Sequence, residues 1–288
     1  MFRKILRVLF YVFAALLLLL ILLFRLEMFT MRTEDRAFIE DLESHGQSLI
    51  RIQDQAVGER NIHTISVGDP SLPTIFFVHG SPGSSNNFQV YLADTSLSQK
   101  AHLVAADRPG FGYSDYGKTE RSVEQQAALL AEVLKTSTQE PAILVGHSYG
   151  GPVIARMAMD HPSLVKALVI VAGSISPDLE PREWWRPVVD FPLIRWILPA
   201  SLRVSNQEIH ALYDELERMM PLWKTIQCPV IVFQGESDSL VPAGNADFAA
   251  LMVPDSLVTI KMVELGDHFI VWSRKDEVVK ILETQLAQ

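Results

Sequence analysis

Cysteine is almost absent from this chain, which carries a single one, Cys228, among 288 residues. A lone thiol forms no internal disulfide, and because Cys228 begins an apolar run it is predicted to be a small core side chain. Cysteines and histidines do not cluster at the spacings of a metal site. The sequence therefore predicts no metal and no other cofactor.

Basic residues are scarce outside the N-terminus. The chain has 25 Lys and Arg against 34 Asp and Glu, a net charge of −9. Residues 1–32 hold five basic residues and one acidic residue, a net charge of +4, so the rest of the chain carries −13. Since nucleic-acid phosphates require a basic surface, this balance argues against nucleic acid as a partner.

One long apolar run is present, from Val8 to Phe24. A membrane-spanning helix needs about 17–25 apolar residues, so a single-pass anchor is predicted at residues 5–26. The alternative is a cleavable signal peptide, but its apolar core usually has about 7–15 residues and ends in a small-residue cleavage site that this sequence lacks. A slight excess of basic residues before the run predicts that the rest of the chain lies on the non-cytosolic side, in the periplasm if the source is bacterial.

The segment Gly146–Gly151 reads Gly-His-Ser-Tyr-Gly-Gly and lies between two predicted elements. The apolar residues 142–145 before it predict a strand, and residues 153–159 after it have a helical pattern. A strand that leads directly into a helix must turn sharply, and glycines on both sides leave room where the two elements converge. This context predicts that Ser148 is an exposed nucleophile rather than part of an ordinary turn.

A nucleophilic serine needs a base, an acid that orients the base, and donors for the developing oxyanion. Candidates follow three other predicted strands: residues 74–78 lead to His79–Gly83, residues 229–233 lead to Gly235–Asp238, and residues 258–263 lead to Gly266–Phe269. Open α/β sheets bind their ligands at the carboxyl ends of the strands, so these groups are predicted to meet at one edge.

The motifs, in this order, resemble those of the α/β-hydrolase family from about Ile52 to the C-terminus. The matching segments are the Gly-x-Ser-x-Gly turn, His79–Gly83, Asp107–Ser114, Gly235–Pro242 and Gly266–Phe269. The resemblance implies an α/β fold with a mostly parallel eight-stranded sheet flanked by helices, and a helical cap inserted after the sixth strand. The first two strands would be residues 49–56 and 61–67, the domain would cover residues 49–288, and the cap would cover about 175–227.

The resemblance also implies roles for the site residues. Ser148 would be the nucleophile, His268 the general base and Asp238 the acid that orients it. The backbone N–H groups of Tyr149 and Ser81 would form the oxyanion hole.

Alternatives to the acid remain open. Some members of the family carry the acid after the sixth strand, where this chain has Asp178, and Glu236 and Asp267 lie close to the predicted site. Of the other histidines, His79 is expected to shape its loop and His147 to point away from the substrate.

The predicted cap is rich in proline and tryptophan. Its Trp184 and Trp185, together with Phe269 after the base, are predicted to line an apolar substrate pocket. Packing of the cap against the sheet explains the tryptophans equally well. Residues 206–220 of the cap have the pattern of a helix.

Residues 33–48 are predicted to link the anchor to the domain through a short helix over residues 33–44. Thr33 is its predicted N-cap, and Gly46 lies just past its end. Phe38 belongs to an apolar side of this helix that would rest against the catalytic domain or the membrane surface.

Together the residues and the resemblance predict a membrane-anchored serine hydrolase. It would cleave a carboxylic ester, or a thioester or lipid-like acyl ester, through an acyl-enzyme intermediate. The serine nucleophile argues against haloalkane dehalogenases and epoxide hydrolases, which in this family attack with an aspartate. Amide or peptide hydrolysis, carbon–carbon hydrolysis and cofactor-free perhydrolysis use the same triad and remain open, as does a non-catalytic homologue that acts as a binding protein. The expected partners are a small-molecule or lipid-like ester and, through the N-terminal helix, a membrane.

Overall fold

A computed structural model of the chain describes residues 2–23 and 30–288. In this part of the chain, eight strands form one sheet with the spatial order β1-β2-β4-β3-β5-β6-β7-β8. The strands are β1 (Ile50–Val57), β2 (Arg60–Val67), β3 (Thr74–Val78), β4 (His102–Ala106), β5 (Ala142–His147), β6 (Val165–Val171), β7 (Val230–Gly235) and β8 (Val258–Val263). The helices are α1 (Phe2–Leu23), α2 (Asp35–Ser44), α3 (Gln89–Leu92), α4 (Thr95–Ser98), α5 (Val123–Ser137), α6 (Gly150–Asp160), α7 (Arg186–Val189), α8 (Pro192–Ile197), α9 (Ala200–Met219), α10 (Gly244–Met252), α11 (Ile270–Ser273) and α12 (Lys275–Leu286).

The sheet is mostly parallel, as predicted. Strand β2 pairs antiparallel with β1 and β4, and from β4 through β3, β5, β6 and β7 to β8 every pair is parallel. The central strands are buried on both faces, which explains why β3 and β6 read as nearly continuous apolar runs rather than alternating patterns.

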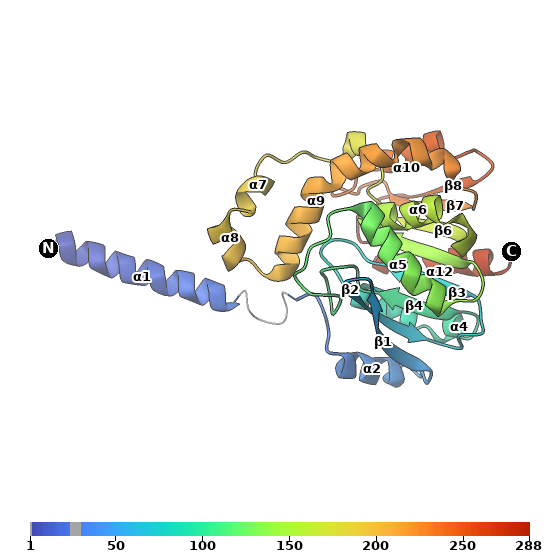
Figure 1. The fold of residues 1–288 in the computed structure, drawn as a ribbon, viewed down its shortest axis with the longest axis horizontal. Coiled ribbons are helices and arrows are strands. Elements are labelled where there is room, and N and C mark those ends of the chain that lie inside the picture. The colour runs from blue at the N-terminus through green and yellow to red at the C-terminus, as the bar shows by residue number, and fades with distance from the viewer. Residues whose placement is uncertain (1, 24–29) are drawn as a thin grey trace.

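Helices cover both faces of the sheet (Figure 1). One core cluster joins the sheet to α5, α6 and α10, and a second joins the opposite face to α2, α3 and α12. Fully burying one apolar side chain contributes about 1.5–3 kcal/mol relative to exposure, so these two clusters are the main favourable contribution to the fold.

Helix α2 is part of the second core cluster rather than a free linker. Its Phe38 and Leu42 are almost fully buried there, so the helix rests against the domain. The prediction that Thr33 is its N-cap is wrong, because Glu34 holds that position without a side-chain capping bond. The carbonyl of Thr33 instead accepts a hydrogen bond of 3.3 Å from the Tyr113 hydroxyl.

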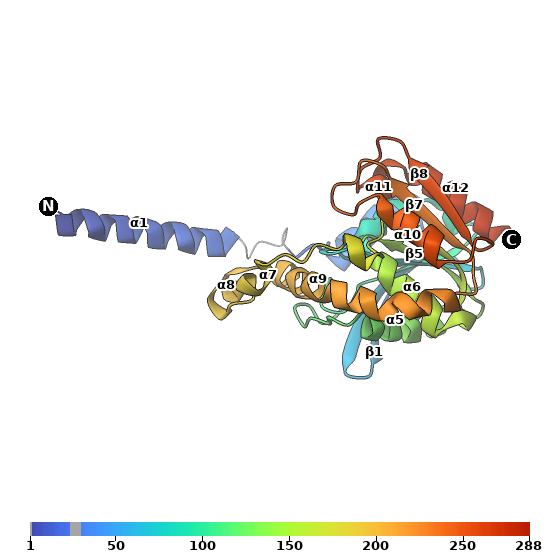
Figure 2. The same cartoon turned by 90° about the horizontal axis from the view of Figure 1, so that it is seen from above.

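The cap lies between β6 and β7 and contains α7, α8 and α9. Helix α9 begins at Ala200, six residues before its predicted start at Asn206. The added first turns are held by tertiary contacts, since Ser201 and Val204 are fully buried. Figure 2 shows α7 and α8 at the end of the molecule that faces α1, with α9 leading back to the sheet.

Helix α1 is long and apolar enough to cross a membrane, and a signal sequence passes the same test. None of its residues is buried, and it projects away from the domain (Figure 1). Residues 24–26 of the predicted anchor lie outside the described residues.

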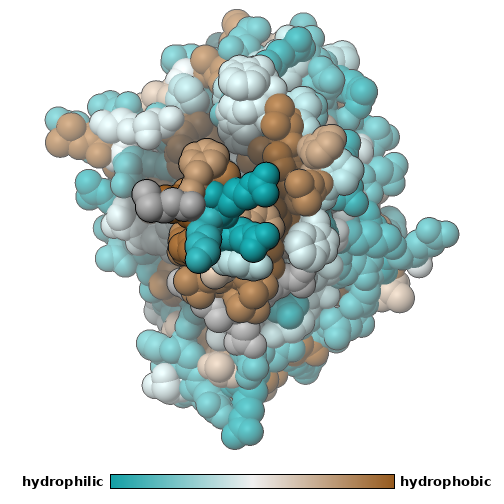
Figure 3. Space-filling model, turned by 90° about the vertical axis from the view of Figure 1, so that its left-hand side faces the viewer, coloured by the Kyte–Doolittle hydropathy of each residue, from teal (hydrophilic) through white to brown (hydrophobic). Residues whose placement is uncertain are grey.

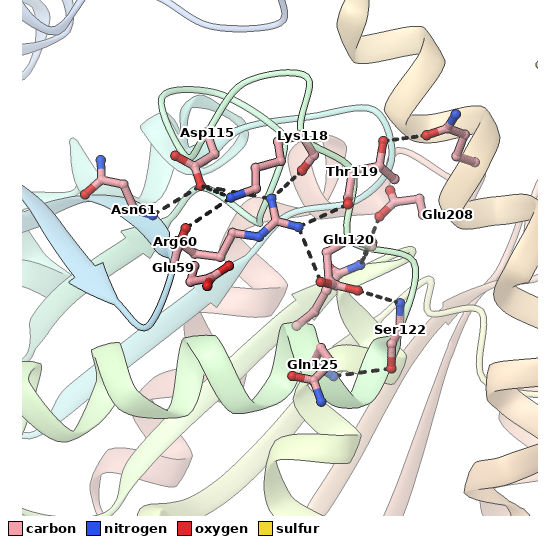
Figure 4. A network of polar contacts seen from close by, with 12 residues as sticks. Glu59, Arg60, Asn61, Asp115, Lys118, Thr119, Glu120, Ser122, Gln125 and Glu208 are labelled. Carbon is pink, nitrogen blue, oxygen red and sulfur yellow. Dashed lines mark hydrogen bonds and ion pairs between the residues drawn. The ribbon is translucent and has the colours of Figure 1, made fainter.

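The loop after β4 is held in place by polar contacts with the β1–β2 turn (Figure 4). Arg60 donates to the carbonyls of Lys118 at 2.6 Å and Thr119 at 3.1 Å, and to the carboxylate of Glu120 at 3.3 Å. Lys118 in turn donates to the carbonyl of Glu59. This loop therefore forms a fixed platform beside the cap.

Candidate active site

Ser148 stands at the turn between β5 and α6. Its backbone φ is +54°, a left-handed conformation that costs a non-glycine residue of order 1–3 kcal/mol. A Cβ on Gly146 would lie 2.4 Å from the carbonyl oxygen of Gly150, and one on Gly150 would lie 2.1 Å from that of Val78. Both glycines are thus required by close packing, which agrees with the sharp turn predicted from the sequence.

His268 and Asp238 come from the ends of β8 and β7 and contact each other directly. The Nδ1 atom of His268 lies 2.8 Å from Oδ2 of Asp238. The other oxygen, Oδ1, accepts the N–H groups of Leu240 at 2.9 Å and Val241 at 2.8 Å. Burial alone would raise the pKa of Asp238, but the hydrogen bonds from His268 and Val241 outweigh it and lower that pKa below its usual value. With Nδ1–H directed at the carboxylate, Nε2 of His268 is left to accept a proton.

Among the described residues, no hydrogen bond or ion pair joins the rival acids to the His268 side chain. Asp178, Glu236 and Asp267 are all exposed. Asp267 accepts the N–H of Phe269 at 2.9 Å, a local turn contact. Asp238 is therefore the carboxylate paired with this histidine.

The predicted oxyanion donors lie on two segments next to Ser148. A Cβ on Gly80 would be 2.9 Å from Cβ of Ser148, so the loop that continues into Ser81 runs directly beside the serine. Tyr149 is the N-cap of α6, and in the described part of the chain no hydrogen bond is donated by the backbone N–H of Ser81 or Tyr149. Both N–H groups are thus available to a bound oxygen.

A buried charged pair supports this loop from beneath. Arg108 and Glu208 are fully buried and form two hydrogen bonds of 2.7 and 2.8 Å. Arg108 also donates to the carbonyls of His79 at 2.8 Å and Gly80 at 2.9 Å. The Nε2 atom of His79 accepts the Arg108 N–H, so His79 shapes the loop as expected. Neither Arg108 nor Glu208 was singled out from the sequence, because their contact joins positions 100 residues apart.

Two cavities meet at Ser148 and His268. The larger has a volume of about 310 Å³ and is lined by Ser81, Ser148, Tyr149, Ser174, Glu180, Pro181, Glu183, Arg186, Ile209, Leu212, Ser239, Leu240, Val241 and His268. The smaller, of about 210 Å³, is lined by Gly80, Ser81, Pro82, Asn87, His147, Ser148, Leu240, His268, Phe269 and Trp272. The structure thus brings Ser148, His268 and both oxyanion donors to one space.

The predicted aromatic pocket is only partly present. Phe269 lines the smaller cavity, whereas Trp184 lines a neighbouring cavity of about 280 Å³ formed by cap residues, and Trp185 lines none of the three. Proline-rich turns carry both tryptophans outward, and Trp184 is 81% exposed. The sequence pattern does not distinguish a tryptophan that faces the site from one that faces away.

His147 does not point away from the site. It lines the smaller cavity, and its Nε2 lies 3.1 Å from the carbonyl oxygen of His268. Burial and the nearby His268 lower the pKa of His147 to about 4, so the ring is neutral near pH 7 and donates its Nε2–H to that carbonyl. It therefore supports the backbone of the base.

Polar cap residues also line the larger cavity, and the sequence did not indicate them. Ser174 donates to Glu180 at 2.6 Å, and burial raises the pKa of this carboxyl. Arg186 contacts Glu183 as an ion pair. The lining of the larger cavity thus includes two carboxyl groups and one guanidinium. Among the described residues no group of three or more His, Cys, Asp or Glu side chains could hold a metal ion.

The family model described as alpha/beta hydrolase fold matches residues 73–193. This match covers less than half of the chain, and together with the sheet topology it shows that the chain has the α/β-hydrolase fold.

Individual relatives are distant. An uncharacterised hydrolase of Saccharomyces cerevisiae is 28% identical over 177 residues, which are 58% of this chain and 60% of the yeast protein. The chain therefore spans less than two thirds of that relative. The 2-(acetamidomethylene)succinate hydrolase of Mesorhizobium japonicum is 26% identical over 235 residues, 69% of this chain and 82% of that protein. The crystal structure of a membrane phospholipase A, described as a bacterial virulence factor, has a TM-score of 0.66 and 18% identity over 100% of this chain and 98% of its own.

Proposed function

We propose that this protein is a membrane-anchored serine hydrolase that cleaves a carboxylic ester, including thioesters and lipid-like acyl esters. The observation that carries the proposal is the strained Ser148 on the same cavity as the paired His268 and Asp238. In this mechanism Nε2 of His268 takes the proton of Ser148 as its oxygen attacks the acyl carbon. Asp238 then stabilises the imidazolium.

The remaining steps use the same groups. The N–H groups of Ser81 and Tyr149 stabilise the oxyanion of the tetrahedral intermediate. His268 returns its proton to the leaving alcohol, which leaves an acyl group on Ser148. A water molecule, activated by His268, then hydrolyses the acyl-enzyme.

The charged side chains that line the larger cavity favour binding of a neutral substrate over one with several negative charges. Glu180 and Glu183 place two carboxyl groups against the single guanidinium of Arg186. A substrate with several carboxylates would meet repulsion there, since like charges in a partly dry site are costly. Apolar side chains, among them Ile209 and Leu212, line the same cavity and favour an acyl chain.

The membrane part of the proposal rests on α1. Its length and composition suit an uncleaved anchor with the domain on the non-cytosolic side. The matched structure described as a membrane phospholipase A, which aligns over the full length of this chain, supports a lipid ester as substrate.

The test of the nucleophile uses an activity-based probe. A fluorophosphonate should label the wild type and leave Ser148→Ala unlabelled, and the variant should lose on the order of 10⁶ in kcat. Ser239→Ala is the matched control, because it removes another exposed serine hydroxyl from the same cavity and should still be labelled. Equal labelling of the wild type and Ser148→Ala would refute the assignment, and absence of labelling in both would favour a non-catalytic binding protein.

A further inference from the structure

The first two cap helices expose an apolar surface. We call it the apolar cap surface, and its members are Trp184, Trp185, Val188, Phe191, Leu193, Ile194 and Trp196. All are at least 36% exposed, and Trp184, Phe191, Leu193 and Trp196 are 60% exposed or more. Soluble surfaces seldom gather so many large apolar side chains without a partner that covers them.

Arginines border this surface. Arg121, Arg195 and Arg203 line one open cavity of about 350 Å³, together with Gly117, Thr119 and Gln207. In the described chain, Arg195 and Arg203 form no ion pair, and Arg121 approaches one carboxylate, that of Asp190, at 3.6 Å. Three guanidinium groups with so little neutralising charge suit the phosphate groups of lipids.

The chain tethers this region close to α1. The N–H of Ser201, at the start of α9, donates to the Tyr116 hydroxyl at 3.3 Å, and the guanidinium of Arg32 lies 5.1 Å from the centre of the Tyr116 ring. Seven peptide steps separate Leu23 from Thr30, which span at most about 25 Å. The apolar cap surface directly precedes Ser201, so it stays near the point where α1 leaves a bilayer.

The views of the molecule agree with this placement. α7 and α8 lie at the end facing α1 in Figures 1 and 2. Figure 3 looks onto that end, where brown apolar residues gather around the end-on helix and teal residues dominate the periphery. The platform loop that carries Tyr116 and Arg121 is fixed by Arg60 (Figure 4), so the tether and the arginines keep a defined relation to the cap.

We propose that the apolar cap surface is a second membrane contact, specific for anionic phospholipids. The side chains of α7 and α8 enter the outer part of one leaflet, and Arg121, Arg195 and Arg203 bind lipid phosphates at its edge. Outside its first 32 residues the chain has a net charge of −13, so an anionic membrane repels it. The three arginines offset that repulsion where the surface contacts the membrane. The proposal concerns binding and not the reaction, so it can fail independently of hydrolysis.

Tryptophan fluorescence tests the insertion directly. All five tryptophans lie after residue 183, so none belongs to α1 and their emission reports on the domain alone. The full chain is reconstituted in phosphatidylcholine–phosphatidylglycerol vesicles with and without bromine atoms on the upper acyl carbons. The wild type should be quenched by the brominated lipid, and Trp184→Phe and Trp196→Phe should each lose part of that quenching. Trp223→Phe is the matched control, because Trp223 is fully buried and should contribute no quenching.

Two outcomes of the quenching experiment would contradict insertion of the apolar cap surface. An unquenched wild type, or equal quenching in the wild type and Trp196→Phe, overturns the insertion. An unquenched wild type whose exposed tryptophans are shielded in a cross-linked dimer would assign the surface to a second copy of the chain. Circular dichroism of each variant separates a local effect from misfolding.

The arginines are tested by lipid composition. Arg121→Gln combined with Arg195→Gln should remove the added quenching that phosphatidylglycerol gives over pure phosphatidylcholine. Arg51→Gln, an exposed arginine on β1, should leave it unchanged. If the double variant responds to phosphatidylglycerol as the wild type does, lipid phosphates are not the ligands of this cluster.

Discussion

At the scale of single residues, the environment of Asp238 predicts a large effect of its substitution on kcat. The carboxylate is buried, accepts two backbone N–H groups and pairs with His268. Asp238→Asn should lower kcat by about 10⁴, because the amide no longer holds the imidazole in the required tautomer. Asp178→Asn should retain activity, since Asp178 is exposed and His268 pairs with Asp238 instead. Steady-state rates of the two variants distinguish the acids, and loss of activity in Asp178→Asn alone would contradict the assignment.

The same residue links stability to pH. Its pKa is lowered in the folded state, so its contribution is fully present above the unfolded pKa of about 3.9 and is lost as the pH falls through the folded value. The difference in melting temperature between the wild type and Asp238→Asn should therefore shrink below about pH 4. Calorimetry at stepped pH measures it, and a gap that stays constant into the acid range would show that Asp238 is not stabilised in its charged form.

At the scale of elements, α9 connects the cap to the loop His79–Ser81, which carries a proposed oxyanion donor. Its Glu208 holds Arg108 against the carbonyls of His79 and Gly80, and its Ser205 accepts a hydrogen bond from Ser81 at 2.9 Å. Removing one partner of a buried ion pair leaves the other unpaired and costs about 3–5 kcal/mol. The position of α9 thus influences Ser81, the proposed oxyanion donor.

Glu208→Gln should lower kcat by about tenfold or more and leave KM nearly unchanged, as expected for an interaction that matters in the transition state. Glu215→Gln is the control, because Glu215 lies on the same helix but bonds to Ser122 and Val123, away from the oxyanion loop. Initial-rate kinetics should reveal the difference. A similar fall in kcat for both variants would indicate general loosening of α9 instead.

At the scale of the whole molecule, the cavities and the proposed membrane anchor α1 together favour a long acyl chain over a small acyl group as the substrate. The 310 Å³ cavity at Ser148 shares Pro181, Glu183, Arg186 and Ile209 with the 280 Å³ cavity formed by cap residues. With the full chain in vesicles, kcat/KM should rise with acyl length, since each buried methylene adds about 0.8 kcal/mol of binding. If kcat/KM is highest for acetyl or propionyl esters and falls steadily with longer chains, the protein is a carboxylesterase for small esters instead.

Ile209→Trp sharpens this prediction. Ile209 lines both cavities, so a larger side chain there should obstruct the passage between them and lower the rate for long acyl esters while sparing acetyl esters. Equal loss for both substrates would place the acyl chain elsewhere, for instance in the cavity beside Phe269.

Local patterns anticipated much of the domain. Strands β3 and β8 match their predicted limits, and β1 and β2 are offset by about one residue, within the usual ambiguity of strand ends. The turn at Ser148 was predictable because its glycines, strand and helix are adjacent in sequence. The start of α9 and the N-cap of α2 were not, since tertiary contacts at Ser201 and Thr33 decide them.

The sequence by itself determined most of the strands, the apolar helix α1 and the residue types that follow the strand ends, because each depends on neighbours in the chain. The order of the strands in the sheet joins distant segments, and only the family resemblance indicated that the sheet is mostly parallel. Only the tertiary structure decided which carboxylate pairs with His268, that His147 faces the cavity, and that Trp184 and Trp185 face outward. It alone joined Arg108 to Glu208 and brought Arg121, Arg195 and Arg203 beside the exposed cap helices. The physical reason is that side-chain direction in loops and caps depends on packing between segments far apart in sequence, which no local pattern encodes.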